Sequence, residues 1–330
     1  MTERCQTGGG GAGTGREASS VLVIAGPTAS GKSSLALAVA ERFGGVVINA
    51  DAMQVYRDVE ILTAQPAAAA RARVPHRLYG VIAPNEPCSA GRWREMALDE
   101  IGAALAGGKL PVVVGGTGLY LKALMEGLAP IPQVPDEVRA SARELHARLG
   151  GKAFHQELRR LDPETAACLE PGDSQRLIRA WEVSRATGRP LSSWHGADGA
   201  GPPPGLAFKT VLLDPPRQAL YAACEARFER MIADGAIEEA KALDARGLDP
   251  ELPVIKALGA RELLGFIHGA IGIDEATSRA KQATRNYAKR QLTWFRRQMA
   301  ADEVIYAQYS ESFNEIIFSF IMSLSLTADR

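Results

Sequence analysis

Eight residues near the N-terminus have the types and spacing of a phosphate-binding loop. The pattern G-x-x-x-x-G-K-S/T is matched by Gly26, Pro27, Thr28, Ala29, Ser30, Gly31, Lys32 and Ser33. Glycines let successive backbone N–H groups face phosphate oxygens, and a lysine adds a full positive charge. A serine at the last position can hold Mg²⁺ against those phosphates. The pattern predicts a phosphorylated ligand, with Mg²⁺ on Ser33; the alternative is a tight glycine turn without a ligand.

Two further polar residues follow predicted strands. Asp51 comes directly after the apolar run 45–50, and Thr117 follows the run 110–114 and two glycines. Ligands of open parallel sheets bind beyond the carboxyl ends of the strands, where the phosphate loop also lies. Asp51 and Thr117 are therefore candidate site residues. The alternative is that each caps the helix that follows it, since Asp and Thr are favoured N-cap residues.

These residues need a parallel sheet to position them. Residues 21–25 are predicted to form a buried strand before the loop, and residues 34–43 an amphipathic helix after it, whose N-terminus adds positive charge. Further strands are predicted at 45–50, 110–114 and 210–214, and a helix at 93–106. Alternating strands and helices indicate an α/β fold, with a parallel sheet flanked by helices.

The composition of the chain changes in its middle. Residues 125–203 are helical and charged and are bounded by proline-rich connectors, which predicts a helical insertion domain in a core of residues 20–124 and 204–312. Residues 1–19 are predicted to be a disordered leader without a signal peptide, in a cytoplasmic protein. In the tail 313–330, the apolar segment 316–326 is too short to span a bilayer, which predicts a terminal helix or strand on the core.

The composition limits the kinds of partner. The chain has 330 residues, of which 46% are hydrophobic, and its formal net charge is +0, so nucleic-acid contacts must come from local patches. One such patch is predicted in the segment 285–297, which has basic and aromatic residues and no acidic one; the alternative is a solvated helix face. Four scattered cysteines, without C-x-x-C spacing, indicate reduced thiols rather than a zinc site: Cys5, Cys88, Cys168 and Cys224.

Five segments, in order, resemble motifs of the bacterial tRNA dimethylallyltransferases (tRNA isopentenyltransferases). The loop resembles G-P-T-A-S-G-K-S/T, and residues 51–57 resemble D-S-M-Q-V-Y-R/K. Residues 115–120 are similar to G-G-T-G/M-L-Y, residues 173–183 to D-x-Q-R-I/L-x-R-A-L/W-E-V, and residues 289–296 to K-R-Q-x-T-W-x-R. The resemblance runs from about residue 21 to residue 297.

The resemblance implies a P-loop NTPase-like fold and a reaction. The dimethylallyl group would pass from dimethylallyl pyrophosphate to N6 of adenosine 37, on the 3′ side of the tRNA anticodon. Asp51 and Thr117 would be catalytic, with Asp51 taking the amine proton, and the loop 26–33 would bind the donor's pyrophosphate with Mg²⁺. The protein would act as a monomer and without a membrane, and it would bind the anticodon stem-loop of the tRNA. The residues in contact with the tRNA would be Asp51, Ala52, Met53, Gln54, Thr117, Arg139, Gln175, Arg176, Leu177, Ile178, Arg179, Lys256, Arg261, Lys289, Arg290 and Arg296.

The sequence departs from the family pattern at four positions. Ala52 stands where Ser is usual, Leu62 and Gln65 stand in a segment that is usually G-T-A-K-P, and Ala260 replaces a usual Tyr. Three other functions share parts of the pattern: a small-molecule or nucleotide kinase, a prenyltransferase acting on free AMP, and an RNA-binding module in which Asp51 is only a helix cap.

Overall fold

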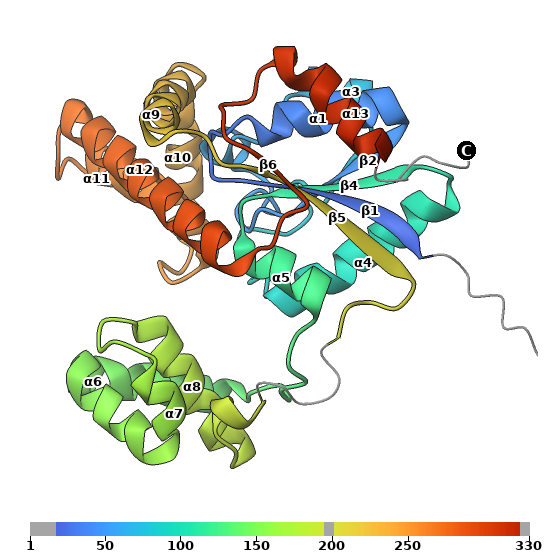
Figure 1. Cartoon of the computed structure of the whole chain (residues 1–330). Coiled ribbons are helices and arrows are strands. Elements are labelled where there is room, and N and C mark those ends of the chain that lie inside the picture. The colour runs from blue at the N-terminus through green and yellow to red at the C-terminus, as the bar shows by residue number, and fades with distance from the viewer. Residues whose placement is uncertain (1–17, 195–200, 324–330) are drawn as a thin grey trace, which may run out of the picture. The chain divides into compact units, whose positions relative to one another are not determined.

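The computed structural model of the chain describes residues 18–194 and 201–323 (Figure 1). Residues 1–17 of the predicted disordered leader lie outside the described residues, and so do residues 324–330 of the tail. The chain divides into two compact units. One unit comprises the described residues up to Leu124 and from Pro203 onward, and the other is the helical unit Met125–Pro202. The bounds of the helical unit differ by one residue from those of the predicted insertion, 125–203.

The first unit is built on a six-stranded parallel sheet with the order β3-β2-β4-β1-β5-β6. Its strands are β1 Ser19–Ala25, β2 Gly45–Asn49, β3 His76–Arg77, β4 Leu110–Gly115, β5 Leu206–Leu213 and β6 Glu303–Ile305. The four predicted strands and the parallel sheet are confirmed. The short strands β3 and β6 were not predicted, because neither has a run of apolar residues.

Helices cover both faces of this sheet (Figure 1). α1 (Lys32–Phe43) and α13 (Asn314–Ser323) lie over one face, and α4 (Ala90–Ala106) and α5 (Gly118–Glu126) over the other. Leu22 and Ile24 of β1 pack with Leu35 of α1, and with Ile317 and Ile321 of α13, in one buried cluster. The predicted packing of the apolar tail on the core is thus confirmed as far as Ser323.

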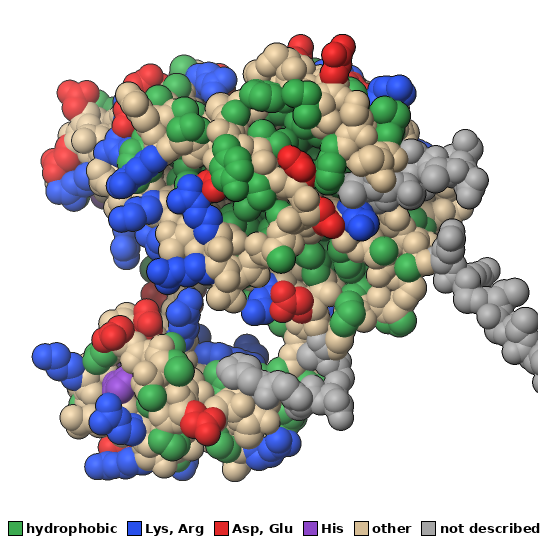
Figure 2. All heavy atoms as spheres, viewed as in Figure 1, with side chains coloured by type: hydrophobic (Ala, Val, Ile, Leu, Met, Phe, Trp, Pro, Cys, Tyr) green, Lys and Arg blue, Asp and Glu red, His purple; other side chains and the backbone are tan. Residues whose placement is uncertain are grey.

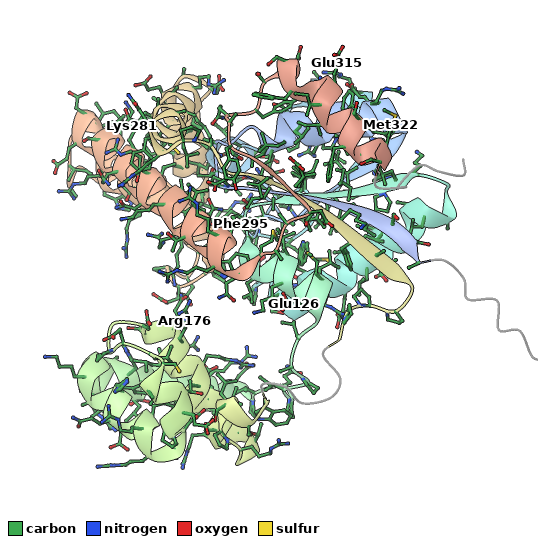
Figure 3. All side chains as sticks on the ribbon, viewed as in Figure 1. Glu126, Arg176, Lys281, Phe295, Glu315 and Met322 are labelled. Carbon is green, nitrogen blue, oxygen red and sulfur yellow. The ribbon has the colours of Figure 1, made fainter. Side chains whose placement is uncertain are left out.

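The helix α13 is short, although it is strongly apolar. It has 10 residues, with Glu315 near its start and Met322 near its end (Figure 3). Within the described residues, none of the helices has the length and apolar character needed to cross a membrane.

The remaining helices of this unit are α2 Glu60–Thr63, α3 Ala68–Arg73, α9 Arg217–Ala233, α10 Ala236–Asp244, η2 Pro253–Lys256, α11 Ala260–Ile267, α12 Ile273–Gln298 and η3 Glu311–Phe313. Of these, α9, α10, α11 and α12 lie together on the left of Figure 1, beside the sheet. The long helix α12 packs on α9 and α11, and its inner face includes the buried Phe295 (Figure 3). The chain after Pro216 is thus mainly helical.

The helical unit has its own core. It consists of α6 Asp136–Leu161, α7 Pro163–Ala167, α8 Ser174–Thr187 and η1 Leu191–Trp194. Phe154 and Leu158 of α6 pack against Leu177 and Ala180 of α8 in an apolar cluster. Asp162, fully buried, caps α7 through Thr165 and also accepts hydrogen bonds from the N–H and hydroxyl of Ser192, so one carboxylate joins α6, α7 and η1.

Candidate active site

The phosphate loop connects β1 to α1 in a conformation that its sequence permits. Gly31 has φ 89° and forms the N-cap of α1. A Cβ atom at Gly31 would lie 2.8 Å from Cβ of Tyr309, so a larger residue would also displace the chain that covers the loop. Ala29 is in the left-handed region as well, with φ 63°. The loop therefore presents the free N–H groups of the first turn of α1 on its inner side.

Lys32 lies buried inside the loop, where its Nζ donates to the carbonyl of Pro27 at 3.2 Å. Burial lowers the pKa of Lys32 to about 8, while the nearby charge of Asp51 opposes that shift. A partly desolvated ammonium next to free N–H groups is stabilised by a bound anion. The electrostatics of the loop thus favour a phosphate or pyrophosphate group.

Gln291 of α12 ties the loop to the neighbouring strand end. Its Oε1 accepts the N–H of Thr28 at 2.8 Å, and its Nε2 donates to the carbonyl of Gly116 at 2.8 Å. Gly116 has no room for a side chain, since a Cβ would lie 2.3 Å from Nε2 of Gln291. Sequence reasoning assigned no role to Gln291, although it stands in the segment 289–296. The signal available in the sequence was helical spacing: every third or fourth residue of α12 faces the core, and Gln291 is one of these buried residues.

Asp51 follows β2 and is half-buried at the same edge of the sheet. Its Oδ1 accepts the N–H of Met53 at 2.9 Å, and its own N–H donates to Asn49 Oδ1 at 2.9 Å. Asn49, fully buried, also donates to the carbonyl of Leu78 at 3.0 Å, which fixes the end of β2. Asp51 Oδ2 makes no hydrogen bond to any described residue, so one carboxylate oxygen is available to a substrate.

Thr117 lies beside Asp51, as the sequence predicted for two neighbouring strand ends. Its Oγ1 accepts the N–H of Ala52 at 2.9 Å. Tyr287 of α12 reaches the same threonine: burial raises the pKa of Tyr287, and a hydrogen bond with Thr117 opposes the shift. Trp294 covers the next turn so closely that a Cβ on Gly118 would lie 2.3 Å from its ring. Thr117 is therefore held from both sides, by the backbone after Asp51 and by α12.

Arg227 of α9 is a site residue that sequence reasoning missed. Its guanidinium donates to Thr28 Oγ1 of the phosphate loop. Burial lowers the pKa of Arg227, and the charge of Asp51 opposes this. Nothing in the local sequence marks it, because it is 199 residues from Thr28 in the chain and occupies an ordinary helical position. It adds a second, half-buried cation at the loop.

Residues of the phosphate loop, Asp51 and Arg227 share one cavity of about 880 Å³, whose lining residues do not include Thr117. Gly31, Lys32 and Ser33 line it together with Asp51 and Arg227. Small and apolar residues form other parts of its wall, namely Ile61, Ala64, Pro66, Ala67, Ala68, Ala223 and Met231. A cavity with cations and N–H groups, a carboxylate and an apolar wall fits a ligand that combines a polyanionic head with a short hydrocarbon.

Several predicted RNA-binding residues lie on the first unit. Ala52 and Met53 are half-buried beside Asp51, whereas Gln54 donates to the carbonyls of Thr63 and Ala64 and so closes the end of α2. Lys289 and Arg290 are exposed on α12, where Figure 2 shows Lys and Arg side chains gathered.

Three other basic residues of this unit differ in whether an acidic side chain pairs with their charge. Arg261 is exposed in the first turn of α11, and Lys256 pairs with Glu251 at 2.9 Å. Arg296 forms a bidentate pair with the buried Asp214, with distances of 2.9 and 2.8 Å. That pair anchors α12 to the end of β5 and compensates the charge of Arg296.

The other predicted RNA-binding residues belong to the helical unit. Gln175 and Arg176 are exposed at the start of α8, where Figure 3 labels Arg176. Ile178 and Arg179 are half-buried, and Arg139 lies on α6 near Asp136. The side chain of Leu177 is fully buried in the apolar cluster of this unit and points away from any RNA-binding surface.

Comparison with known proteins agrees with this geometry. The family model described as IPP transferase matches residues 54–298, and that described as isopentenyl transferase matches residues 19–80. A tRNA dimethylallyltransferase of Rhodospirillum centenum is 60% identical over 281 residues, which cover 85% of this chain and 90% of the relative.

Solved structures give the same result. The full-length tRNA isopentenylpyrophosphate transferase from Bacillus halodurans matches with a TM-score of 0.66 at 31% identity, covering 93% of this chain and 96% of that one. A eukaryotic dimethylallyltransferase acting on tRNA matches with a TM-score of 0.72 at 27% identity, over 84% and 70% of the two chains. The resemblance that the motifs indicated is confirmed: the chain belongs to the IPP transferase family.

Proposed function

We propose that this chain is a tRNA dimethylallyltransferase. It transfers the dimethylallyl group from dimethylallyl pyrophosphate to N6 of adenosine 37, on the 3′ side of the anticodon. The observation that carries the proposal is the single cavity in which the phosphate loop, Arg227 and Asp51 meet a wall of small and apolar residues. A pyrophosphate head, a five-carbon chain and an amine to be deprotonated each find matching groups there.

The donor's pyrophosphate binds the phosphate loop. N–H groups at the start of α1, Lys32 and Arg227 neutralise its charge, and the apolar wall accepts the dimethylallyl chain. As the bond between C1 and oxygen breaks, negative charge grows on the departing pyrophosphate. Because these donors are already fixed by the fold, they stabilise that charge without reorganising, which lowers the barrier.

The site residues also fit Mg²⁺. Ser33 is exposed in the first turn of α1 and lines the cavity, while no cluster of three or more His, Cys, Asp or Glu occurs in the described parts of the chain. Mg²⁺ is commonly held by one or two protein groups together with substrate phosphates, and a lone hydroxyl beside a phosphate loop suits that mode. Bound there by Ser33, the ion would supply further charge neutralisation to the leaving group.

The acceptor is an exocyclic amine, which is a weak nucleophile because its lone pair is delocalised into the adenine ring. Asp51 accepts a hydrogen bond from this N–H, orients the lone pair and takes the proton as the new C–N bond forms. Thr117, held by Ala52 and Tyr287, lies beside Asp51 to fix the base. The base must leave the stacked anticodon loop to arrive there, as in other enzymes that act on a nucleobase.

The net charge of the chain is +0, so binding of the tRNA must rely on local groups of basic and polar side chains. The exposed Lys289 and Arg290 on α12, and Gln175 and Arg176 on α8, are suited to phosphate and sugar contacts. The proposed enzyme acts as a monomer.

Mass spectrometry of a tRNA tests the proposal. An unmodified transcript with adenosine 37 is incubated with the protein, dimethylallyl pyrophosphate and Mg²⁺, beside free AMP and a transcript with guanosine 37. We expect one added dimethylallyl group on the first RNA only. Modification of AMP would move the assignment to a mononucleotide prenyltransferase, and ATP consumption without prenyl transfer would indicate a kinase.

A further inference from the structure

The chain that follows β6 passes directly over the phosphate loop. Nε2 of Gln308 donates to the carbonyl of Ala29, 279 residues earlier in the sequence. The N–H of Tyr309 donates to the carbonyl of Ser30 at 3.3 Å. Both residues also line the donor cavity. Two successive carbonyls of the loop are thus bound from outside by two successive residues of the C-terminal segment.

This C-terminal segment is itself fixed to the core. Tyr309 is 9% exposed and packs in the buried cluster with Ile317 and Ile321 of α13. Its hydroxyl donates to Asn314 Oδ1 at 2.6 Å, at the start of the same helix. Cβ of Tyr309 also lies 2.8 Å from the place that a Cβ on Gly31 would take. These contacts anchor the segment to the core and to the loop.

The direction of a carbonyl decides the direction of the following N–H. In a planar trans peptide the C=O and the next N–H point to opposite sides. When Tyr309 binds the carbonyl of Ser30 on the outside of the loop, the N–H of Gly31 must face inward, where the anion binds. Gln308 fixes the peptide before it, whose N–H, that of Ser30, donates to the carbonyl of Pro27 at 3.3 Å and so closes the turn of the loop. Ala29 is in the strained left-handed conformation, with φ 63°, and needs such contacts to stay there.

We propose that Gln308 is a positioning residue for the prenyl donor. It acts through the backbone of the phosphate loop: by binding the carbonyl of Ala29 it holds the loop in the conformation in which the N–H of Gly31, oriented by Tyr309, faces the pyrophosphate. That the anion is the pyrophosphate of dimethylallyl pyrophosphate rests on the proposed function. The contact between Gln308 and the loop does not.

The variant Gln308→Met tests this directly. Methionine has the length of glutamine but cannot donate a hydrogen bond. It also removes Oε1, which is buried without a hydrogen-bond partner among the described residues, so the folded state should lose little stability. The matched control is Ser312→Ala, on the same segment, which removes the hydrogen bond between the Ser310 and Ser312 hydroxyls and touches neither loop nor cavity.

Two quantities are measured for each variant: the Kd of inorganic pyrophosphate with Mg²⁺ by calorimetry, and the KM values of dimethylallyl pyrophosphate and of tRNA. For Gln308→Met we expect the Kd of pyrophosphate and the KM of the donor to rise about five-fold or more, as for one lost hydrogen bond. The KM of tRNA and the melting temperature should match those of the control.

An unchanged Kd of pyrophosphate in Gln308→Met would overturn the proposal. So would equal rises in both KM values with a lower melting temperature, which would make the glutamine a general structural residue. The pyrophosphate measurement needs no turnover. A wild-type protein that binds pyrophosphate but transfers no prenyl group would refute the proposed function alone, and the Gln308 variant would still decide the positioning role.

Discussion

Asp51 uses its two carboxylate oxygens differently, and this gives the sharpest test of its role. Oδ1 accepts the N–H of Met53, whereas Oδ2 makes no bond to the described residues. In Asp51→Asn the amide oxygen can still accept from Met53, so the local fold should persist while the base is lost. We expect the single-turnover rate of prenyl transfer to fall by about 10²–10⁴. The affinity for tRNA, measured by filter binding, should change little; loss of both would make Asp51 a structural residue.

The lowered pKa of Lys32 predicts how donor binding depends on pH. Burial lowers its pKa to about 8, so the unliganded enzyme loses this positive charge as the pH rises through 8. The anion binds the protonated form, and the Kd of pyrophosphate should therefore rise above pH 8, by up to about ten-fold per pH unit. In Lys32→Met the affinity should be lower by about 10- to 100-fold and this pH dependence should disappear. Calorimetry at several pH values checks it; a wild-type Kd that stays constant up to pH 10 would contradict it.

The site was predictable from sequence only where chemistry and local pattern coincide. The phosphate loop, Asp51 and Thr117 stand at the ends of strong apolar runs, so their shared edge follows from the sheet. Arg227 enters the same site from a helix far along the chain, and no local pattern distinguishes an arginine that points inward from one that is solvated.

At the scale of elements, the strength of the hydrophobic pattern decided what could be predicted. β2 and β4 are buried along their whole length, and β1 from Val21 to Ala25, so their bounds were nearly right. β3 has two polar residues, His76 and Arg77, and becomes a strand only because β2 offers a free edge. α8 was predicted as a contact segment from its motif, yet the same motif must also supply the buried core of its unit, which is why Leu177 points inward.

Asp162 predicts the acid stability of the helical unit. Burial raises its pKa, but hydrogen bonds from Thr165 and Ser192 outweigh burial and hold the pKa below its usual value. A carboxyl with a lowered pKa in the folded state contributes stability above its unfolded pKa of about 4, and this is lost as the pH falls further. Asp162→Ala should destabilise the unit by about 2–3 kcal/mol at pH 7.

Amide hydrogen exchange of full-length protein measures this effect locally. Peptides from α6 and α8 should exchange faster in Asp162→Ala, and peptides from β1 and β4 should not. Asp136→Ala, whose side chain is 95% exposed at the start of α6, is the matched control. Equal acceleration in both variants would show that the buried hydrogen bonds add no specific stability.

On the scale of the whole molecule, a chain without net charge binds tRNA through the placement of its cations. Lys289 is exposed on α12, whereas Lys281 on the same helix pairs with Glu229 at 2.6 Å. Lys289→Ala should weaken tRNA binding and lower the slope of log Kd against log salt by about 0.7–0.9, the loss of one phosphate contact. Lys281→Ala should leave the slope nearly unchanged. Titrations over a range of KCl concentrations give both slopes, and identical slopes for the two variants would remove α12 from the tRNA interface.

The position of β1 between β4 and β5 also matters while the chain is being made. One edge of β1 pairs with a strand that ends at Gly115, but the other waits for a strand that begins at Leu206. Translation adds about 5–20 residues per second, so the central strand emerges from the ribosome long before its second neighbour exists. The helical unit, with its own core, can fold during that delay. The bare edge of β1 is meanwhile open to pairing with other chains, and we expect truncated translation products that end within the helical unit to aggregate.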